Sequence, residues 1–293
     1  MPNSPIDTFE DSYAIAVHDA GAANMIAAWV GAAQRAPEMV VAQGPARAIW
    51  QQRFGTGTRF EGDPERVQGA KVVISGTGWA SDLEHRARAI AAEAGVRSVA
   101  VVDHWVNYKA RFERDGVTQW PDAIWVGDDE ALAIARRTFP EVPADRHANL
   151  YLAQQAREAG PAPKDGDVLF ASEPAHSDWG GDRAGEFQAL DHFMASRQLA
   201  GIRRNAAVRL RPHPSDPSGK YDEWLSNHPT ARLDTSPDMA TALQTAKWVV
   251  GMNSMGLVIA LQAGRKVLCA LPPCAPPCAL PHRGILSLRT SPA

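Results

Sequence analysis

Strand-like and helix-like segments alternate along most of the chain, and this alternation is the sequence feature that most restricts the fold. In the first half, short apolar runs rich in β-branched residues are each followed by a helix-forming stretch. After the third run, for example, Leu83, Ala87, Ile90 and Ala91 recur at helical spacing and would share one face. The strands predicted in this half are 12–17, 38–43, 71–76, 97–103 and 122–127.

The alternation stops in a polar, Pro-containing segment around 140–166 and then restarts. The strands predicted after it are 167–172, 206–213, 230–235, 247–252 and 266–271. Ser236 followed by Pro237 predicts a helix start, with Ser as the N-cap. Strands alternating with helices indicate parallel βαβ units. We therefore predict an α/β protein of two Rossmann-like domains, 1–150 and 165–293, that face a cleft.

Composition excludes several classes of protein. The 293 residues carry a formal net charge of −3, which argues against a protein that coats nucleic acid non-specifically. No apolar run approaches the roughly 20 residues of a membrane span, and the N-terminus is polar and acidic. We therefore expect a cytoplasmic protein with at most peripheral membrane contact. All three cysteines lie within 269–278, a Pro-rich stretch that predicts a loop rather than a metal site.

In parallel α/β folds, ligands bind beyond the carboxyl ends of the strands, so the residues at those ends are the first candidates for a site. His18 and Asp19 follow the first predicted strand, Gly21 permits a tight turn, and Asn24 lies in the next helix. That helix start offers N–H groups to an anion or a sugar. The segment lacks the glycine pattern of a dinucleotide site, so we expect a substrate cleft here, or a simple helix cap at Asp19.

Two further strand ends in the first domain carry candidate residues. Gly76 permits close approach of the backbone to a substrate, or it belongs to a plain βα turn. Asp103, His104 and Trp105 follow the fourth predicted strand in succession. A carboxylate beside an imidazole is a reasonable source of a general base. Asp103, His104 and Asp19 are therefore our catalytic candidates, and Trp105 is a substrate-cleft candidate.

The most specific signal lies at the end of strand 206–213. His213 stands between two prolines, Pro212 and Pro214, which hold the backbone extended and present the imidazole rigidly. Arg211 lies close to it in the sequence. An imidazole and a guanidinium both suit a phosphate.

Asn253 and Ser254 lie at the junction between strand 247–252 and an apolar helix. A Ser hydroxyl and the first N–H groups of a helix can together hold a phosphate, although alone they also fit a simple N-cap. Because His213 lies one βα unit earlier, we predict that His213, Arg211, Asn253 and Ser254 bind the phosphate of a donor nucleotide.

This combination of motifs resembles that of a group of bacterial glycosyltransferases. The Arg-Pro-His-Pro strand end at 211–214, followed by Val-Val-Gly-Met-Asn-Ser at 249–254 and a small-residue helix, is similar to bacterial GT-B enzymes. The nearest groups are the sialyl-, polysialyl- and Kdo-transferases and the CDP-glycerol glycerophosphotransferases. The resemblance implies a first domain on the acceptor side and a second domain that binds the donor nucleotide. In those families the matching positions, His213, Pro214 and Ser254, hold the nucleotide's phosphate. The sialyltransferases carry an acidic-acidic-Gly motif where this chain has Asp103-His104-Trp105.

The resemblance implies an inverting, metal-independent glycosyltransferase of surface polysaccharide or glycoconjugate synthesis. It would move a sugar from a nucleotide-sugar, with a CMP-linked donor favoured, to a hydroxyl of a glycan or glycoconjugate. The nucleotide-sugar is then a substrate, and no resident cofactor is expected. We interpret Asp128-Asp129 as a helix start and not as a metal-binding pair. The alternatives are a UDP-N-acetylglucosamine 2-epimerase-like enzyme and a non-catalytic protein that binds a nucleotide or phosphosugar.

Overall fold

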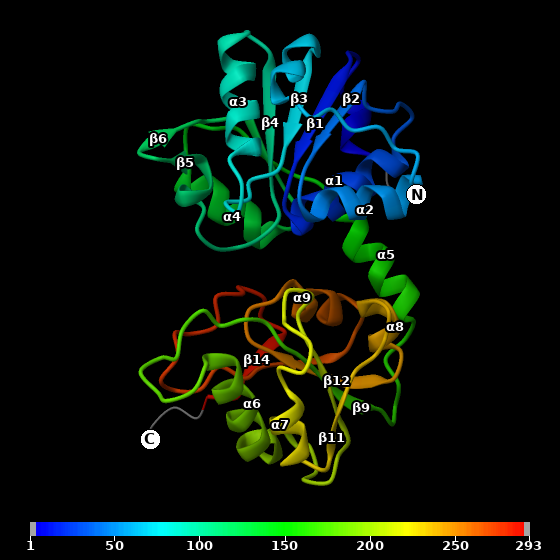
Figure 1. The fold of residues 1–293 in the computed structure, drawn as a ribbon, viewed down its shortest axis with the longest axis vertical. Helices are drawn as coiled ribbons and strands as arrows, with labels where there is room; N and C mark the ends of the chain where they lie inside the picture. The colour runs from blue at the N-terminus through cyan, green and yellow to red at the C-terminus, as the bar shows by residue number, and fades with distance from the viewer. Residues whose placement is uncertain (1–3, 290–293) are drawn as a thin grey trace. The chain divides into compact units, whose positions relative to one another are not determined.

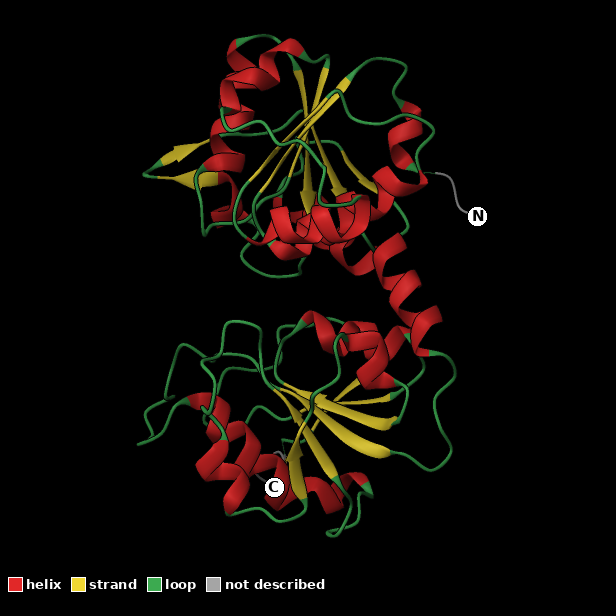
Figure 2. Cartoon of the chain, turned by 45° about the vertical axis from the view of Figure 1, so that its right-hand side comes forward, coloured by secondary structure: helices red, strands yellow, loops and turns green. Residues whose placement is uncertain are grey.

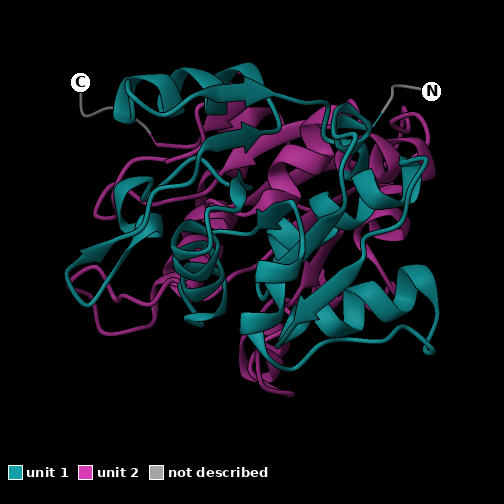
Figure 3. Ribbon diagram, turned by 90° about the horizontal axis from the view of Figure 1, so that it is seen from above, with its two compact units in different colours: residues 1–151 teal, residues 152–293 magenta. Residues whose placement is uncertain are grey.

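The computed structural model describes residues 4–289. The chain divides into two compact units, residues 1–151 and residues 152–293, coloured teal and magenta in Figure 3. Within the described residues, each unit contains a parallel sheet of six strands with helices packed on its faces (Figure 2). The predicted α/β fold with two Rossmann-like units is therefore confirmed.

The N-terminal unit has the strand order β2-β1-β3-β4-β7-β8. Its strands are β1 (Tyr13–Val17), β2 (Met39–Ala42), β3 (Val72–Ser75), β4 (Arg97–Val102), β7 (Ala123–Val126) and β8 (Ala144–Arg146). Its helices are α1 (Ala20–Ala32), α2 (Pro45–Phe54), α3 (Leu83–Glu93) and α4 (Asp129–Thr138), with α5 (Leu150–Ala159) at the boundary of the units. Short 3₁₀ helices are η1 (Pro5–Thr8), η2 (Pro64–Gly69) and η3 (Lys109–Phe112). A small antiparallel hairpin, β5 (Glu113–Arg114) and β6 (Val117–Thr118), lies by the start of α3, where His85 Nε2 is 3.2 Å from the Val117 carbonyl oxygen (Figure 1).

Two apolar layers bury the central strands of the N-terminal sheet from both sides. On one face, Ile15 and Val17 of β1 pack with Trp29 of α1 and Trp50 of α2. On the other face, the alternate residues of β1 pack with α3 and η2. Burial on both faces explains why β1 and β3 contain only apolar residues up to Ser75. Polar residues are consequently displaced to the strand ends, where a ligand site can form.

The C-terminal unit repeats this plan with the order β11-β10-β9-β12-β13-β14. Its strands are β9 (Asp167–Ala171), β10 (Val208–Arg211), β11 (Ala231–Leu233), β12 (Ala246–Gly251), β13 (Lys266–Cys269) and β14 (Ile285–Ser287). Its helices are α6 (Gly185–Ser196), α7 (Asp222–Ser226), α8 (Met239–Leu243) and α9 (Met255–Gln262), with the 3₁₀ helix η4 (Arg197–Ala200). Phe170 of β9 packs with Leu190 and Phe193 of α6, and α9 contacts β12 and β13.

Arg209 is a buried charged residue in the C-terminal unit. It alternates with Val208 and Leu210 as predicted, yet its side chain is buried. The guanidinium donates to Asp167 at 2.6 Å and to Asp234 at 2.6 Å, and also to the Ala242 carbonyl. A buried charge is tolerated only when it is paired in this way. Arg209 therefore joins β9, β10 and α8 behind the strand ends.

Three local predictions differ from the structure. The segment 140–166 is not only a polar connection, because it contains β8 and α5. A further strand, β14, follows 266–271. Helix α8 begins after Asp238, whose carboxylate accepts from the Thr241 N–H, and not at Ser236-Pro237. Ser236 instead donates its hydroxyl to Asp234.

The Cys-containing stretch is also more closely packed than a free loop. Cys269 ends β13 and is buried, with its Sγ 3.2 Å from the Met252 carbonyl oxygen, whereas Cys274 is exposed. Across residues 4–289, none of the helices combines the length and the apolar composition needed to cross a membrane.

Candidate functional site

Both sheets reverse their strand order beside their first strand. In the N-terminal unit β1 lies between β2 and β3, and in the C-terminal unit β9 lies between β10 and β12. Connections from neighbouring strand ends diverge at such a switch point and leave a crevice, where ligands of open α/β sheets bind. The first switch point lies beyond β1 and β3, and the second lies beyond β9 and β12. Most of the predicted site residues lie at these two places.

Glu84 connects the two strand ends of the first switch point. Its carboxylate is completely buried and accepts from the His18 N–H after β1 (2.9 Å) and from the Gly78 N–H after β3 (2.6 Å). Gly76, predicted to permit close approach, packs here: a Cβ on it would lie 2.1 Å from Glu84 Oε1. Burial raises the pKa of Glu84 from its ordinary 4.5 to about 6, against the opposing effect of the two N–H donors. Glu84 thus sets the spacing of the two loops.

His18 and Asp19 form a hydrogen-bonded pair. His18 Nδ1 lies 2.7 Å from Asp19 Oδ1, and both side chains are partly exposed. A carboxylate at Nδ1 favours the proton on that nitrogen, which leaves Nε2 as the acceptor of the neutral ring. The other oxygen of Asp19 lies against Gly78, where a Cβ would approach it to 1.8 Å. This pair has the composition of an oriented general base.

Asp103 lies at the end of β4 and is paired with a buried arginine. Arg111 donates to Asp103 Oδ1 at 3.1 Å and also to Thr77 after β3. Asp103 Oδ2 lies against Gly21 in the first turn of α1, and a Cβ there would be 1.7 Å away. Any side chain larger than glycine would displace the carboxylate. Asn24, one turn later in α1, bonds its amide to the Ala20 carbonyl.

His104 and Trp105 have different surroundings. His104 Nδ1 accepts from the Trp105 N–H at 3.0 Å, so the neutral ring carries its proton on Nε2. The Trp105 side chain is buried, and its Nε1 donates to Asp128. Trp105 therefore packs inside the unit, and its predicted place in a substrate cleft stays a prediction.

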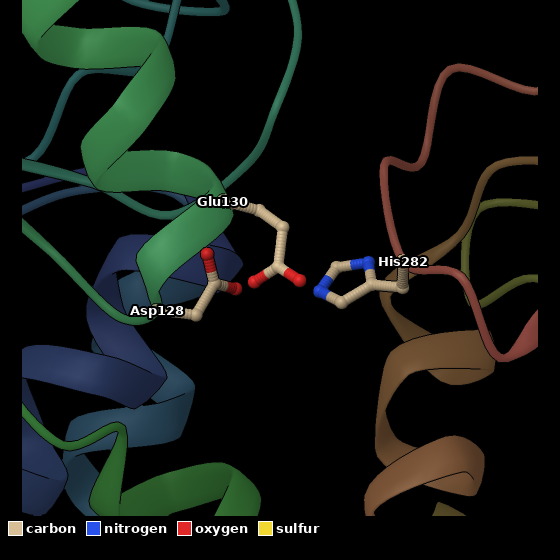
Figure 4. Close-up of side chains that lie close together, drawn as sticks. All are labelled: Asp128, Glu130 and His282. Atoms are coloured by element: carbon tan, nitrogen blue, oxygen red, sulfur yellow. The ribbon is translucent and has the colours of Figure 1, made fainter.

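Asp128 is the N-cap of α4, and its Oδ1 accepts from the Ala131 N–H at 2.6 Å. The predicted helix start at Asp128-Asp129 is therefore confirmed. Figure 4 shows the Asp128 and Glu130 side chains at this helix start. Acidic residues at such a start complement the positive end of the helix.

The second switch point brings Ser254 and Glu173 to adjoining strand ends. Ser254 is the N-cap of α9, but its Oγ is buried and has no hydrogen-bond partner within residues 4–289. A buried hydroxyl without a partner costs about 1–3 kcal/mol. At the N-terminus of a helix, where backbone N–H groups also lack partners, an anion would satisfy both. Gly256 keeps this turn open, because a Cβ on it would lie 2.4 Å from the end of Met239.

Glu173 joins the two strand ends of the second switch point. Its Oε1 accepts from the Asn253 N–H at 2.5 Å, and the Asn253 side chain accepts from the Ala279 N–H. Burial raises the pKa of Glu173 from 4.5 to about 7, with a further contribution from Cys278 and opposition from the Asn253 N–H. Near neutral pH, the Glu173 carboxyl group is therefore protonated in a substantial fraction of the molecules, and in that form it can donate a hydrogen bond.

The local backbone fixes the tautomer of His213. The ring is exposed, and its Nδ1 accepts from the Ser215 N–H at 3.2 Å and lies 2.7 Å from the Ser215 hydroxyl. A nitrogen that accepts from an N–H carries no proton, so the neutral ring holds its proton on Nε2. Nε2–H is then a donor beyond the end of β10.

Asp216 and Lys220 hold the His213 loop in place. Asp216 accepts from the His213 N–H, from the Tyr221 hydroxyl and from Lys220 at 2.7 Å. Lys220 also contacts Glu186 of α6 at 2.5 Å, and Tyr221 bonds to Ser172 at the end of β9. Burial alone would raise the pKa of Asp216, but these hydrogen bonds, with that from Lys220 first, hold it below its ordinary value. The loop is therefore anchored to the central strand.

Arg211 is already occupied within the protein. Its guanidinium donates to Asp234 at 2.7 Å and to the Ser236 carbonyl at 2.9 Å. Both hydrogen bonds use Nη1, so they orient the guanidinium without excluding a contact of its other nitrogens with a donor phosphate. The roles predicted for Arg211, Ser254 and His213 stay predictions.

Sequence reasoning missed the residues that connect the loops. Glu84 resembles an ordinary first-turn helix residue, and Glu173 directly follows a predicted strand without any motif. The spacing of Asp216 and Lys220, four residues apart beside His213, was the one available signal. The other contacts join residues far apart in the chain.

Comparisons with solved structures identify proteins of the same fold. The UDP complex of Staphylococcus aureus MnaA is similar with a TM-score of 0.63 and 12% identity over 88% of this chain and 79% of the other. The UDP-GlcNAc 2-epimerase of Neisseria meningitidis, bound to UDP-GlcNAc, has a TM-score of 0.57 and 10% sequence identity, and the match covers 88% of this chain and 82% of the other. Anabaena HepE in complex with UDP has a TM-score of 0.53 and 10% sequence identity, and the match covers 96% of this chain and 86% of the other. Neither models of protein families nor curated proteins match the sequence. The similarity establishes a GT-B-like arrangement of elements and no more.

Burial of the Glu84 carboxyl group predicts a pH-dependent stability. Because folding raises its pKa, the native state favours the protonated carboxyl, and its stabilising contribution is lost as pH rises from 4.5 through about 6. Glu84→Gln removes this titration. We expect the free energy of unfolding of the wild type, relative to Glu84→Gln, to fall by about 1–2 kcal/mol between pH 4.5 and 7.5 in urea titrations.

Glu93→Gln, at an exposed glutamate of the same helix, controls for the loss of one negative charge. If the free energy of unfolding of the wild type rises relative to that of Glu84→Gln as the pH increases, the raised pKa of Glu84 is contradicted.

Proposed function

We propose that the protein is an enzyme acting on a nucleotide-sugar, whose C-terminal unit binds the nucleotide through its phosphate. The observation that carries this proposal is the buried Ser254 hydroxyl at the N-terminus of α9, which has no hydrogen-bond partner among residues 4–289. His213 lies two strands away, beyond β10, with β9 between β10 and β12. Neighbouring strands are about 4.8 Å apart, so the ends of β10 and β12 lie about 10 Å apart on either side of β9, and the two donors would approach a phosphate from opposite sides.

In this proposal the C-terminal residues stabilise the phosphate as the bond to the sugar breaks. Ser254, the first N–H groups of α9 and the Nε2–H of His213 donate to the oxygens that gain negative charge. Protonated Glu173 adds a donor at the same strand ends. The fixed tautomer of His213 matters because it presents a proton without the cost of ring reorientation. No metal ion is needed for this arrangement of donors.

The N-terminal unit would supply the base. The His18–Asp19 pair is the stronger candidate, since Asp103 is held by Arg111 and lies against Gly21. In a glycosyl transfer, this base removes the proton of the acceptor hydroxyl while the sugar carbon exchanges its bond to phosphate oxygen for one to the acceptor oxygen. The acceptor would be a hydroxyl of a glycan or glycoconjugate.

UDP is the nucleotide to test first, because the structures named above contain UDP or UDP-GlcNAc. The CMP-linked donor rests on the sequence motifs alone. The same similarity favours a second candidate reaction, that of a UDP-GlcNAc 2-epimerase.

Removal of the Ser254 hydroxyl should weaken nucleotide binding directly. A hydrogen bond to a charged group contributes about 1.5–3 kcal/mol, so we expect Ser254→Ala to raise the Kd for UDP roughly tenfold to hundredfold in isothermal titration calorimetry. Ser226→Ala, at an exposed serine of the same unit, should leave the Kd unchanged. CMP titrated in parallel identifies the preferred base. Equal affinities of wild type and Ser254→Ala for both nucleotides would refute the phosphate site.

Deuterium incorporation separates the two reactions. Epimerisation at C2 must break the C2–H bond, whereas glycosyl transfer leaves that bond intact. For a glycosyltransferase we expect UDP-GlcNAc incubated in D2O to keep hydrogen at C2 and to release UDP only when an acceptor is added. Deuterium at C2 in the absence of an acceptor, followed by NMR, would instead establish epimerisation, and simultaneous release of UDP would show that water takes the sugar in a hydrolysing form of that reaction.

A further inference from the structure

Trp79 is an exposed aromatic ring at the first switch point. It lies in the loop between β3 and α3 and is 49% exposed, whereas Trp29, Trp50 and Trp125 of the same unit are buried. Exposure alone does not single out this residue, since Trp120 of the same unit is 44% exposed, but Trp79 lies beside the candidate carboxylates of the first switch point. Nothing in the proposed phosphate chemistry uses it.

Gly78, the residue before Trp79, has both its backbone N–H and its carbonyl hydrogen-bonded to side chains. The Gly78 N–H donates to buried Glu84 at 2.6 Å, and the Gly78 carbonyl accepts from Arg114 of the β5–β6 hairpin at 2.5 Å. One helix and one hairpin therefore hold the loop from opposite sides. A ring on such a loop is presented in a defined position rather than left to move.

A cation covers the ring from one side. The Arg111 guanidinium lies over the indole, 5.2 Å from the ring centroid, and the same guanidinium pairs with Asp103. Arg111 is buried, so its position is set by the interior of the unit. Trp79 is thereby coupled to the Asp103 carboxylate, and Asp19 lies against the adjacent Gly78. The surroundings of the ring thus contain two carboxylates together with the guanidinium groups of Arg111 and Arg114.

We propose that Trp79 is a stacking platform for the pyranose ring of a sugar, and that Asp19 and Asp103 accept its hydroxyls. A pyranose has a face of C–H groups and a rim of hydroxyls. The C–H face packs on the electron-rich face of an indole, and carboxylates accept hydrogen bonds from the rim. An aromatic face beside fixed carboxylates matches both parts. This inference rests on the proposed nucleotide-sugar function and adds a sugar subsite in the N-terminal unit.

The test measures sugar binding separately from nucleotide binding. Calorimetric titrations would compare wild type, Trp79→Ala, Trp79→Phe and Trp120→Ala, the last removing another exposed tryptophan of this unit (44% exposed). The probes are UDP, CMP, a panel of UDP- and CMP-linked sugars, and methyl glycosides of the same sugars.

We expect Trp79→Ala to weaken binding of a sugar-containing probe roughly tenfold and to leave UDP and CMP unchanged. Trp79→Phe should recover most of the affinity, and Trp120→Ala should match the wild type. A loss confined to the nucleotide-sugars assigns the ring to the donor, and a loss for the free glycosides assigns it to the acceptor.

If every sugar-containing probe has the same affinity for Trp79→Ala as for Trp120→Ala, Trp79 does not stack on a sugar, even when nucleotide binding is intact. If wild type binds neither UDP nor CMP, the proposed function itself has failed. A loss for UDP or CMP alone equal to that for their sugars would show that Trp79 acts on folding or on the nucleotide, and would also overturn the platform.

Discussion

In each unit, a buried carboxylate joins the backbone of two strand ends at the point where the sheet reverses its order. Glu84 accepts from the loops after β1 and β3, and Glu173, which follows β9, accepts from the loop after β12. A parallel sheet brings its strand ends to one edge, but divergent connections would otherwise leave these loops unconnected. Glu84 accepts two backbone N–H groups and Glu173 accepts one. The positions of His18, Asp19 and Asn253 depend on the loops held in this way.

The same arrangement explains why both carboxyl groups are poised near neutral pH. Burial raises the pKa of Glu84 to about 6 and that of Glu173 to about 7, although N–H donors oppose the shift in both cases. In the N-terminal unit the carboxylate is fully enclosed, which suits a structural link. In the C-terminal unit it accepts from Asn253, the residue before Ser254, whose hydroxyl has no partner within the described part of the chain. If an anion binds there as proposed, a change of protonation of Glu173 would alter its binding.

The sequence was sufficient to predict the class of fold and most of the central strands. Runs such as that of β1 are apolar on both faces because helices cover both sides, and such runs are readable without a structure. The short edge strands β8 and β14 were missed, since three residues carry too little pattern. The start of α8 was misplaced because Ser236-Pro237 and Asp238 are both good caps, and only the Thr241 contact distinguishes them.

The candidate site was predictable only in part. His18, Asp19, Asp103, His213 and Ser254 are polar residues at strand ends, so their placement follows from the fold. The contacts of Glu84 and Arg111 join residues distant in the chain, and burial of a charge leaves no local pattern. Solved structures with about a tenth of their residues identical share this fold, so the chemistry must be decided at the sites themselves.

Hydrogen–deuterium exchange with and without saturating UDP tests the central claim most directly, because it locates the nucleotide without assuming a reaction. A phosphate site at the second switch point predicts slower exchange at 212–216 and 251–257, around His213 and the start of α9, in the presence of UDP. Slower exchange confined to other segments, or unchanged exchange in both of these at saturation, would contradict a phosphate site at the second switch point.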